Sequence, residues 1–397
     1  MSANNITKLF PFRRIKINKI NVTNQNRVIV HVEPDRRYVP ICSGCKQKVR
    51  SVHSYNHRTL RDMPMSGSEV LVLYTYRTLR CPLCGMKVEH HDFVKPYERV
   101  TERFSLYIYQ LCQVMSIIDV SNHTGLSWDQ VRHNDQRHLE ARFKNQVLEN
   151  IEILCIDEIS IKKRHHYLTI IADYKTGRVI HVARKRNYEA VTKFLKSLSK
   201  KTLKGIKAVA MDMWDPYIKA FRDVCPEACI VFDPFHVIAE FSRVIDKIRA
   251  EQYRNADPER RKIMKRSRFL LLKNPQNLDD KERPRLVAIL EENELLSSVY
   301  LLKEYLKRIW QYKYPKWALK FLHYWCDLAN ETGCSHLIRF AKTLMRHEYG
   351  LISHCRFPIH TNRLEGINNK IKVIKRKAYG YRDLEYFSLK IMQATCN

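Results

Sequence analysis

The segment Glu152-Ile-Leu-Cys-Ile-Asp-Glu-Ile-Ser-Ile161 reads as a buried strand with an acid near its middle. Two more apolar strands are expected over residues 167–173 and 178–183, joined by a turn that ends at Gly177. Further along, helical and apolar segments alternate. They predict a helix over 188–200, a strand over 206–212, a helix over 217–224 and a short strand over 229–233.

This element order, three meander strands followed by alternating helices and strands, is that of the ribonuclease-H-like fold. It predicts an α/β protein with a mixed sheet. Asp157 and Asp212 both belong to apolar strands, so they can lie side by side on neighbouring strands. Acids placed there suit divalent cations, which activate an attacking oxygen and stabilise a leaving oxygen in phosphodiester chemistry. Taken singly, each acid can instead be a turn or helix cap. Glu158 points to the opposite sheet face by period-two alternation, so it is a poor ligand.

Two neighbouring motifs add candidates around this edge of the sheet. Asp233 and His236 stand three residues apart at a strand-to-helix junction. They can either support the active site or, for Asp233, cap the helix that begins near Pro234. Trp214 can stack on a DNA base, although a buried aromatic at a helix start is an equally good interpretation.

An all-α insertion is predicted between the strand ending at Asp233 and the last part of the core. Helices are expected over residues 260–273, 286–294, 298–312 and 317–330. A helix over 361–377 follows, with an apolar stripe formed by Leu364, Ile367, Ile371 and Ile374. Its other side carries Glu365 as a metal-ligand candidate, and six cations against one acid favour DNA contact over a merely solvated face. The DNA-contact candidates on this helix are Asn369, Lys372, Lys375 and Arg376, and the amide of Asn368 belongs to the same row.

Four of the twelve cysteines form two Cys-x-x-Cys pairs with 35 residues between them. Two such pairs complete a tetrahedral zinc site, so we expect Cys42, Cys45, Cys81 and Cys84 to bind a structural Zn²⁺. The strand-like run over 69–80 leads into the second pair, as in a zinc ribbon. The alternative is two chance pairs of buried cysteines.

A helix-turn-helix is predicted downstream of the cysteine pairs. Apolar residues recur at helical spacing over 104–120. A short helix and a turn at Gly125 are expected within residues 117–126, and Ser127 is expected to cap a helix over 128–142. Arg132, Asn134 and Arg137 are the candidates for contact with DNA. A plain three-helix linker is the alternative interpretation.

The overall charge agrees with a nucleic-acid partner. The chain has 71 Lys and Arg against 41 Asp and Glu, a formal net charge of +30 over 397 residues. No stretch has the apolar length of a membrane span, and residues 1–14 do not read as a secretion signal. The absence of a glycine-rich phosphate loop argues against a nucleotide cofactor.

Taken together, these motifs resemble the DDE transposases of the ISL3 group of bacterial insertion sequences. The resemblance rests on the cysteine pairs, the helix-turn-helix, the motifs around Asp157, Asp212 and Asp233, and residues 361–381. It implies a catalytic triad of Asp157, Asp212 and Glu365 that binds Mg²⁺ or Mn²⁺, cleaves DNA at element ends and joins them to a target. Asp233 and His236 match a short signature of related transposases.

The expected domains are a zinc ribbon (1–98), a helix-turn-helix (99–148), a ribonuclease-H-like core (149–250 and 351–397) and a helical insertion (251–350). The expected partners are element-end and target DNA and a second copy of the chain, in a homodimer or larger synaptic complex. A location in the bacterial cytoplasm, at the nucleoid, is expected. The rival interpretations are a nuclease without strand transfer and a non-catalytic DNA-binding regulator.

Overall fold

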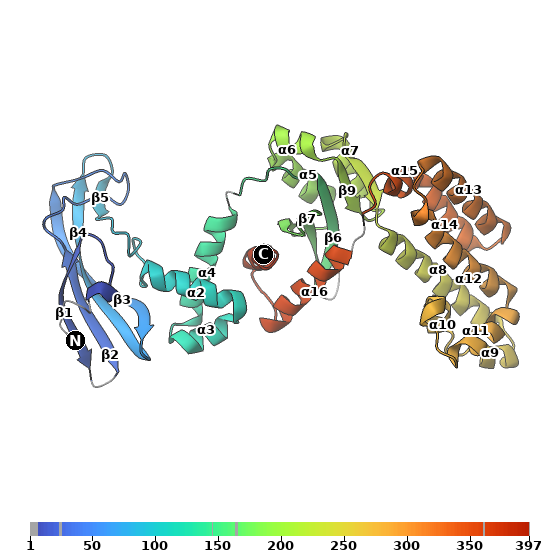
Figure 1. Cartoon of the computed structure of the whole chain (residues 1–397), viewed down its shortest axis with the longest axis horizontal. Helices are drawn as coiled ribbons and strands as arrows, with labels where there is room; N and C mark the ends of the chain where they lie inside the picture. The colour runs from blue at the N-terminus through green and yellow to red at the C-terminus, as the bar shows by residue number, and fades with distance from the viewer. Residues whose placement is uncertain (1–6, 24–25, 145, 163–165, 360–361, 397) are drawn as a thin grey trace. The chain divides into compact units, whose positions relative to one another are not determined.

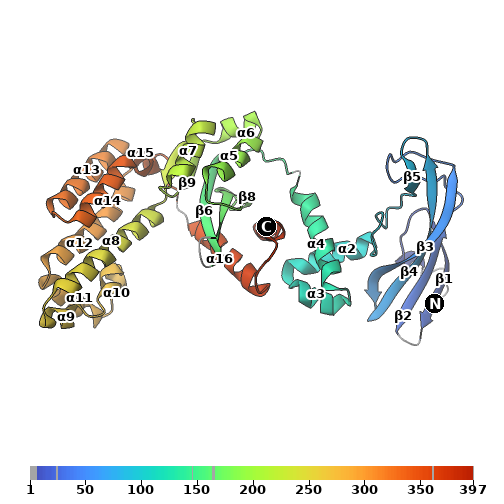
Figure 2. The same cartoon turned by 180° about the vertical axis from the view of Figure 1, so that it is seen from behind.

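The computed structural model describes residues 7–23, 26–144, 146–162, 166–359 and 362–396. The chain divides into two compact units, residues 1–146 with 377–380 and residues 147–376 with 381–397. Their helices and strands are labelled from opposite sides in Figures 1 and 2. Among the described residues, every helix is too short or too polar to traverse a lipid bilayer.

The first unit begins with a five-stranded sheet of order β1-β2-β4-β3, in which the short β5 pairs with β4. β2 and β4 are parallel and the other pairs are antiparallel. Ser66 and Gly67 join β3 to β4 with φ angles of 49° and 77°, which suit a tight two-residue hairpin. β4 confirms the strand expected over 69–80. The elements are η1 (Thr7–Leu9), β1 (Ile15–Thr23), β2 (Arg27–Pro34), β3 (Val52–Met65), β4 (Ser68–Cys81) and β5 (Gly85–Val88).

Three helices complete the first unit: α2 (Glu102–Val114), α3 (Ile117–Thr124) and α4 (Trp128–Phe143). α3 ends at Gly125, whose φ of 69° supplies the left-handed cap. Ser127 caps α4 and forms a capping box with Gln130. The predicted turn, cap and short helix before Gly125 are therefore confirmed, and the helical segment expected over 104–120 ends as α2 before the capping residue Ser116.

The second unit is built on a mixed sheet of order β10-β9-β6-β7-β8. β6, β7 and β8 form the antiparallel meander, while β9 and β10 run parallel to β6. Gly177 has a φ of 73° in the turn before β8, as the sequence predicts. This order confirms the ribonuclease-H-like α/β core. The strands are β6 (Ile153–Lys162), β7 (His166–Asp173), β8 (Val179–Ala183), β9 (Ala208–Met211) and β10 (Cys229–Phe232).

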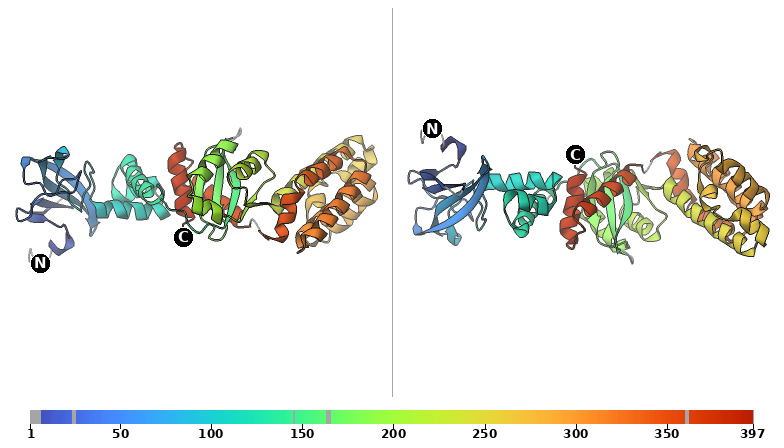
Figure 3. Two further views of the ribbon diagram at one scale, coloured as in Figure 1. Left: turned by 90° about the horizontal axis from the view of Figure 1, so that it is seen from above. Right: turned by 90° about the horizontal axis from the view of Figure 1, so that it is seen from below.

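Helices cover both faces of this sheet (Figure 3). Val191 and Phe194 of α5 and Phe221 of α7 pack against one face. Ile371 of α16 and Ile391 of α17 pack against the other face. The helix expected over 188–200 is confirmed as α5, which ends at Ser197, and Ser199 then caps the separate short helix α6. The helices are α5 (Tyr188–Ser197), α6 (Lys200–Gly205), α7 (Asp215–Val224), α16 (Asn362–Lys377) and α17 (Leu384–Ala394).

The region between β10 and α16 is helical, as predicted. The expected helix over 260–273 is broken in two, because Arg266 adopts a left-handed φ of 59° between α9 and α10. The elements are α8 (Pro234–Asn255), α9 (Pro258–Met264), α10 (Arg268–Leu272), η2 (Pro275–Asn277), α11 (Glu282–Glu291), α12 (Glu294–Leu306), η3 (Lys307–Gln311), α13 (Pro315–Glu331), α14 (Ser335–Arg346), α15 (Glu348–Ile352) and η4 (Ser353–Cys355).

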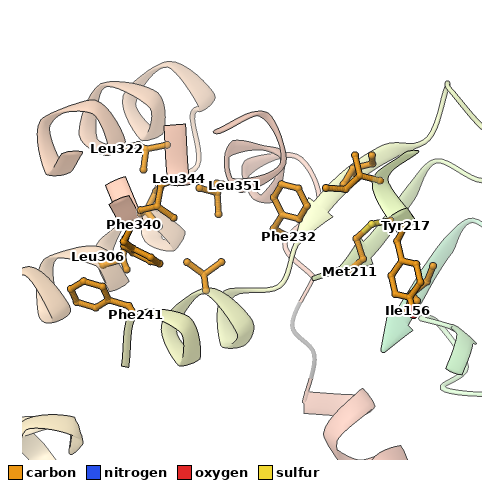
Figure 4. Close-up of a cluster of buried hydrophobic side chains, with 14 of the residues drawn as sticks. Ile156, Met211, Tyr217, Phe232, Phe241, Leu306, Leu322, Phe340, Leu344 and Leu351 are labelled. Atoms are coloured by element: carbon orange, nitrogen blue, oxygen red, sulfur yellow. The ribbon is translucent and has the colours of Figure 1, made fainter. Parts of the chain in front are cut away.

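The insertion shares one hydrophobic core with the sheet. Phe232, at the end of β10, is fully buried and packs towards α15, and Phe241 of α8 carries the same core on to Phe340 (Figure 4). Gly350 of α15 lies directly against the Phe232 ring, where a side chain would collide with it. The core that supports the strand ends therefore continues into the insertion.

Candidate functional site

Strand register brings three aspartates to one level of the sheet. Cys155 of β6 pairs with Ala210 of β9, and Ala210 pairs with Val231 of β10. Two positions after these paired residues, the chain has Asp157, Asp212 and Asp233. Since side chains alternate along a strand, these three acids share the sheet face of Cys155, Ala210 and Val231. That face is the one covered by α16 and α17.

His236 lies among these acids, in the first turn of α8. Its Nδ1 is 2.7 Å from Oδ1 of Asp212, and its Nε2 is 3.8 Å from Oδ1 of Asp157 and 3.5 Å from Oδ2 of Asp233. Burial alone would lower the pKa of His236. The hydrogen bond to Asp212 and the charges of the three acids outweigh burial and raise the pKa to about 9.

Asp233 has two roles in this arrangement. Its Oδ1 accepts a hydrogen bond of 3.0 Å from the backbone N–H of Phe235, so it caps α8 with Pro234 in the first turn. Its Oδ2 faces His236. The cap interpretation is confirmed, and the contact with His236 leaves support of the active site as a prediction.

Asp157 is held by a residue more than 200 positions away. The amide of Asn368 on α16 donates to Oδ2 at 2.5 Å, and the backbone N–H of Glu158 donates to Oδ1 at 2.7 Å. Burial raises the pKa of Asp157 above its ordinary value. The Glu158 N–H, His236 and the Asn368 amide partly offset that effect. A nearby cation would further favour the ionised carboxylate.

Glu365 lies in the first turn of α16, three residues before Asn368, so the two share one side of the helix. The helix is fixed to the sheet by Ile367 and Ile371, and Glu365 itself is exposed. Residue 361 lies outside the described residues, and so do the side chains of residues 362–364, including the expected apolar contact of Leu364.

Glu158 lies on the opposite sheet face, as alternation predicts. It forms an ion pair with Arg186, and its pKa is raised by burial. The guanidinium of Arg186 lies 4.0 Å from the ring centroid of Trp214, which keeps 36 % of its surface exposed. Glu158 thus anchors the cation that covers Trp214 and does not join the acids on the other face.

The polar residues of α16 divide into two groups. Asn369, Lys372 and Arg376 are exposed and remain candidates for DNA phosphates. Lys375 donates instead to the backbone carbonyl of Ile161, so it fastens α16 to the end of β6. We therefore do not count Lys375 among the side chains available to DNA.

The four cysteines of the first unit converge in one cluster. The sulfur atoms of Cys42, Cys45, Cys81 and Cys84 all lie within 4.8 Å of one another. Thiolates in this number and arrangement fit Zn²⁺. Among the described residues, no histidine joins the cluster.

Backbone geometry explains why these two turns can meet. In each pair the residue after the second cysteine is left-handed, with φ of 62° at Lys46 and 69° at Gly85. A Cβ at Gly44 would lie 3.0 Å from Sγ of Cys84, so the close approach of the pairs favours glycine there. Burial opposes ionisation of Cys81, but the N–H groups of Leu83 and Cys84, together with the thiols of Cys45 and Cys42, outweigh it and lower the pKa to about 7.

The helix-turn-helix candidates differ in accessibility. Asn134 is 3 % exposed; its amide accepts from Ser105 and donates to the carbonyl of Gln130. The Arg137 side chain, 17 % exposed, pairs with Glu102 at 2.7 Å. Both residues therefore hold α4 against α2, which corrects their place among the DNA-facing side chains. Arg132, whose guanidinium lies 5.7 Å from the Trp128 ring centroid, stays a candidate.

The sequence groups Asn368 with the amides and cations expected to face DNA, whereas in the structure its amide is bound to Asp157. The available signal is its position three residues after Glu365, which puts both on one side of the helix. Its contact with Asp157 depends on how α16 packs, which no local pattern encodes.

The sheet order, the cysteine cluster and the helix-turn-helix are together those of a DDE-type transposase, and comparison with known families gives the same class. The transposase profile of the ISL3 group matches residues 154–391. The helix-turn-helix domain of transposase family ISL3 matches residues 89–133, and the zinc finger of the IS204/IS1001/IS1096/IS1165 transposases matches residues 38–84. The chain belongs to the ISL3 transposase family.

Two curated relatives show how far the similarity extends. The chain is 37 % identical over 369 residues to the transposase for insertion sequence element IS1001 of Bordetella parapertussis, covering 92 % of this chain and 91 % of that protein. It is 24 % identical over 381 residues to the transposase for insertion sequence element IS1557 of Mycobacterium tuberculosis, covering 90 % and 86 %.

Proposed function

We propose that this transposase binds the terminal inverted repeats of an insertion sequence, cleaves DNA at those ends and joins the freed ends to target DNA. The observation that carries the proposal is the register of β6 and β9, which sets Asp157 beside Asp212 on the face covered by α16. Glu365 is the third member, from the same side of α16 as Asn368. These three residues are the proposed catalytic triad.

The donor set fits a hard divalent cation. Carboxylate oxygens are the ligands that Mg²⁺ and Mn²⁺ take in proteins, and a cation beside Asp157 would offset the cost of burying its charge. Asp157, Asp212 and Glu365 would hold the metal. When bound, it would supply activation of the attacking oxygen and stabilisation of the leaving oxygen.

The residues around the triad have separate tasks. Asn368 fixes the orientation of the Asp157 carboxylate through its hydrogen bond. His236 lies between Asp157 and Asp212 and offsets part of their negative charge. Asn369, Lys372 and Arg376 would bind the DNA backbone next to the triad. Trp214, which has the Arg186 guanidinium over its ring, would offer its exposed part to a base.

The first unit would supply recognition of the element ends. The zinc-stabilised sheet and the α3–α4 helix-turn-helix would bind end DNA, with Arg132 the predicted α4 contact that remains a candidate. Two ends must be held together for joining, so we propose a homodimer or larger assembly acting at the bacterial nucleoid.

A strand-transfer assay separates this proposal from its rivals. The purified protein is incubated with Mg²⁺, a labelled element end and a supercoiled target plasmid. Joined end–plasmid products support the transposase. Nicks without joining would indicate a nuclease, and end binding without cleavage would indicate a non-catalytic regulator; either result contradicts the proposal.

A further inference from the structure

Residues 300–324 of the insertion are unusually aromatic and basic. They include eight aromatic residues, six Lys and Arg, and one acid, Glu304. That acid is neutralised locally, because Lys303 and Lys307 lie 3.3 Å and 2.9 Å from its carboxylate. In contrast, residues 257–294 hold ten cations, eight acids and one aromatic residue. The positive charge of the insertion is therefore concentrated in the segment that contains the second half of α12, η3 and the first part of α13.

Aromatic and basic side chains of this segment come together from three successive helical elements, α12, η3 and α13. The Tyr305 and Phe321 rings are stacked, with centroids 6.4 Å apart. The Arg308 guanidinium lies 5.5 Å from the Tyr305 ring and 5.8 Å from the Phe321 ring. Along α13, Trp317, Phe321 and Tyr324 recur at helical spacing. We call six residues the aromatic stripe: Tyr305, Arg308, Trp317, Lys320, Phe321 and Tyr324.

Much of the aromatic stripe faces solvent. Trp317 is 57 % exposed and Tyr324 is 52 % exposed, so the hydrophobic core does not account for either ring. Arg308 and Lys320 are also exposed; Arg308 lies over the Tyr305 and Phe321 rings, and Lys320 lies 5.8 Å from the Trp317 centroid. The aromatic stripe thus offers flat apolar faces together with fixed positive charge.

This combination favours a polyanion whose aromatic rings are not already stacked on one another. In duplex DNA the bases are stacked on one another, and only phosphates would meet the stripe. In a single strand every base offers a π-face for stacking while the backbone meets the cations. We propose that the aromatic stripe binds unpaired DNA, with bases stacked on Trp317 and Tyr324 and phosphates paired with Arg308 and Lys320. The proposal rests on the proposed function only for the source of that strand, an end opened during cleavage.

The test uses the full-length chain and a fluorescein-labelled single strand of about 20 thymidines. Unlabelled duplex is present in excess to occupy surfaces that bind double-stranded DNA. Trp317→Ala combined with Tyr324→Ala should weaken single-strand binding about tenfold or more in anisotropy titrations, because each stacked base contributes substantially. Trp317→Phe should retain most of the affinity. Arg308→Gln combined with Lys320→Gln removes two proposed phosphate contacts. The slope of log affinity against log salt concentration should therefore become shallower by about 1.4 on a single strand.

Matched controls come from the nearly neutral part of the same insertion. Phe269→Ala removes an exposed ring and Lys262→Gln removes an exposed cation, and both should bind the single strand like the wild type. Unchanged single-strand affinity in the Trp317 and Tyr324 double variant would overturn the proposal. The proposal would also be overturned if the double variant changed only the oligomeric mass measured by ultracentrifugation, because the stripe would then be a contact between copies of the chain.

The two proposals fail separately. Asp157→Asn should abolish cleavage and leave binding of the single strand intact. Loss of single-strand binding in the stripe variants, with duplex binding intact, supports the stripe whatever the outcome at the triad.

Discussion

Gly350 is the position where the link between the insertion and the catalytic sheet can be tested most simply. An alanine Cβ there would lie 2.4 Å from both Cδ2 and Cε2 of Phe232 and 3.0 Å from Cζ. Carbon atoms normally approach to about 3.5–4.0 Å, so the ring or α15 must move by about 1 Å. The ring has little room, because His347 and Tyr349 pack edge-on with centroids 5.3 Å and 5.5 Å away.

Overpacking of this kind costs about 1–3 kcal/mol in free energy of unfolding. For a unit of this size each kcal/mol lowers Tm by about 2–4 °C, so Gly350→Ala should lower it by about 2–12 °C. Differential scanning calorimetry of the full chain measures the shift. Gly366→Ala is the matched control: a Cβ there meets nothing within 4 Å, and an alanine in a helix is favourable, so Tm should stay equal or rise.

A double variant decides whether the collision is the cause. Phe232→Leu removes the ring that the methyl group added by Gly350→Ala would strike, so the two substitutions together should cost less than the sum of their separate costs. A wild-type Tm for Gly350→Ala would refute the reasoning. Strict additivity of the two costs would refute it as well.

Three further outcomes are expected. Cys42→Ser and Cys81→Ser should each abolish the bound zinc measured by plasma mass spectrometry, and unchanged zinc content would exclude the four-cysteine site. Burial, with a smaller effect of Lys193, lowers the pKa of His181 to about 4, below its unfolded value of about 6.5. The unfolded chain therefore takes up this proton first, and stability falls as pH decreases from about 6.5 to 4. In urea unfolding, the free energy of unfolding of His181→Gln should fall by about 1–2 kcal/mol less than that of the wild type between pH 7 and 5. Parallel plots of that free energy against pH would refute the assignment. End-DNA affinity should fall steeply with salt, and Lys372→Gln should reduce the slope by about 1, whereas a flat salt profile would contradict phosphate contact.

The sheet and its acids could be predicted because their signals are local. The apolar run before Asp212 indicates a buried strand, and the acid indicates where that strand ends. Ser127 and Gly125 carry the chemistry of a helix start and a helix end, so the helix-turn-helix boundaries were also predictable. In such places the information lies within a few residues.

The features that the sequence did not predict depend on tertiary contacts. Asn134 and Arg137 lie on a helix that is polar around most of its surface, and the sequence does not indicate which polar side packs against α2. The left-handed Arg266 gave no local signal, since arginine seldom adopts that conformation. The hydrogen bond between Asn368 and Asp157 joins positions 211 residues apart and arises only when α16 docks on the sheet.

The central claim is that Asp157, Asp212 and Glu365 carry the chemistry, and single substitutions measured with one labelled element end test it most directly. Asp157→Asn, Asp212→Asn and Glu365→Gln should each reduce Mg²⁺-dependent cleavage by at least about 10³-fold while end binding stays within about twofold of the wild type. Asp215→Asn is the matched control, an exposed acid three residues after Asp212, and should still cleave. Full cleavage by any one of the three variants would remove that residue from the triad and contradict the account.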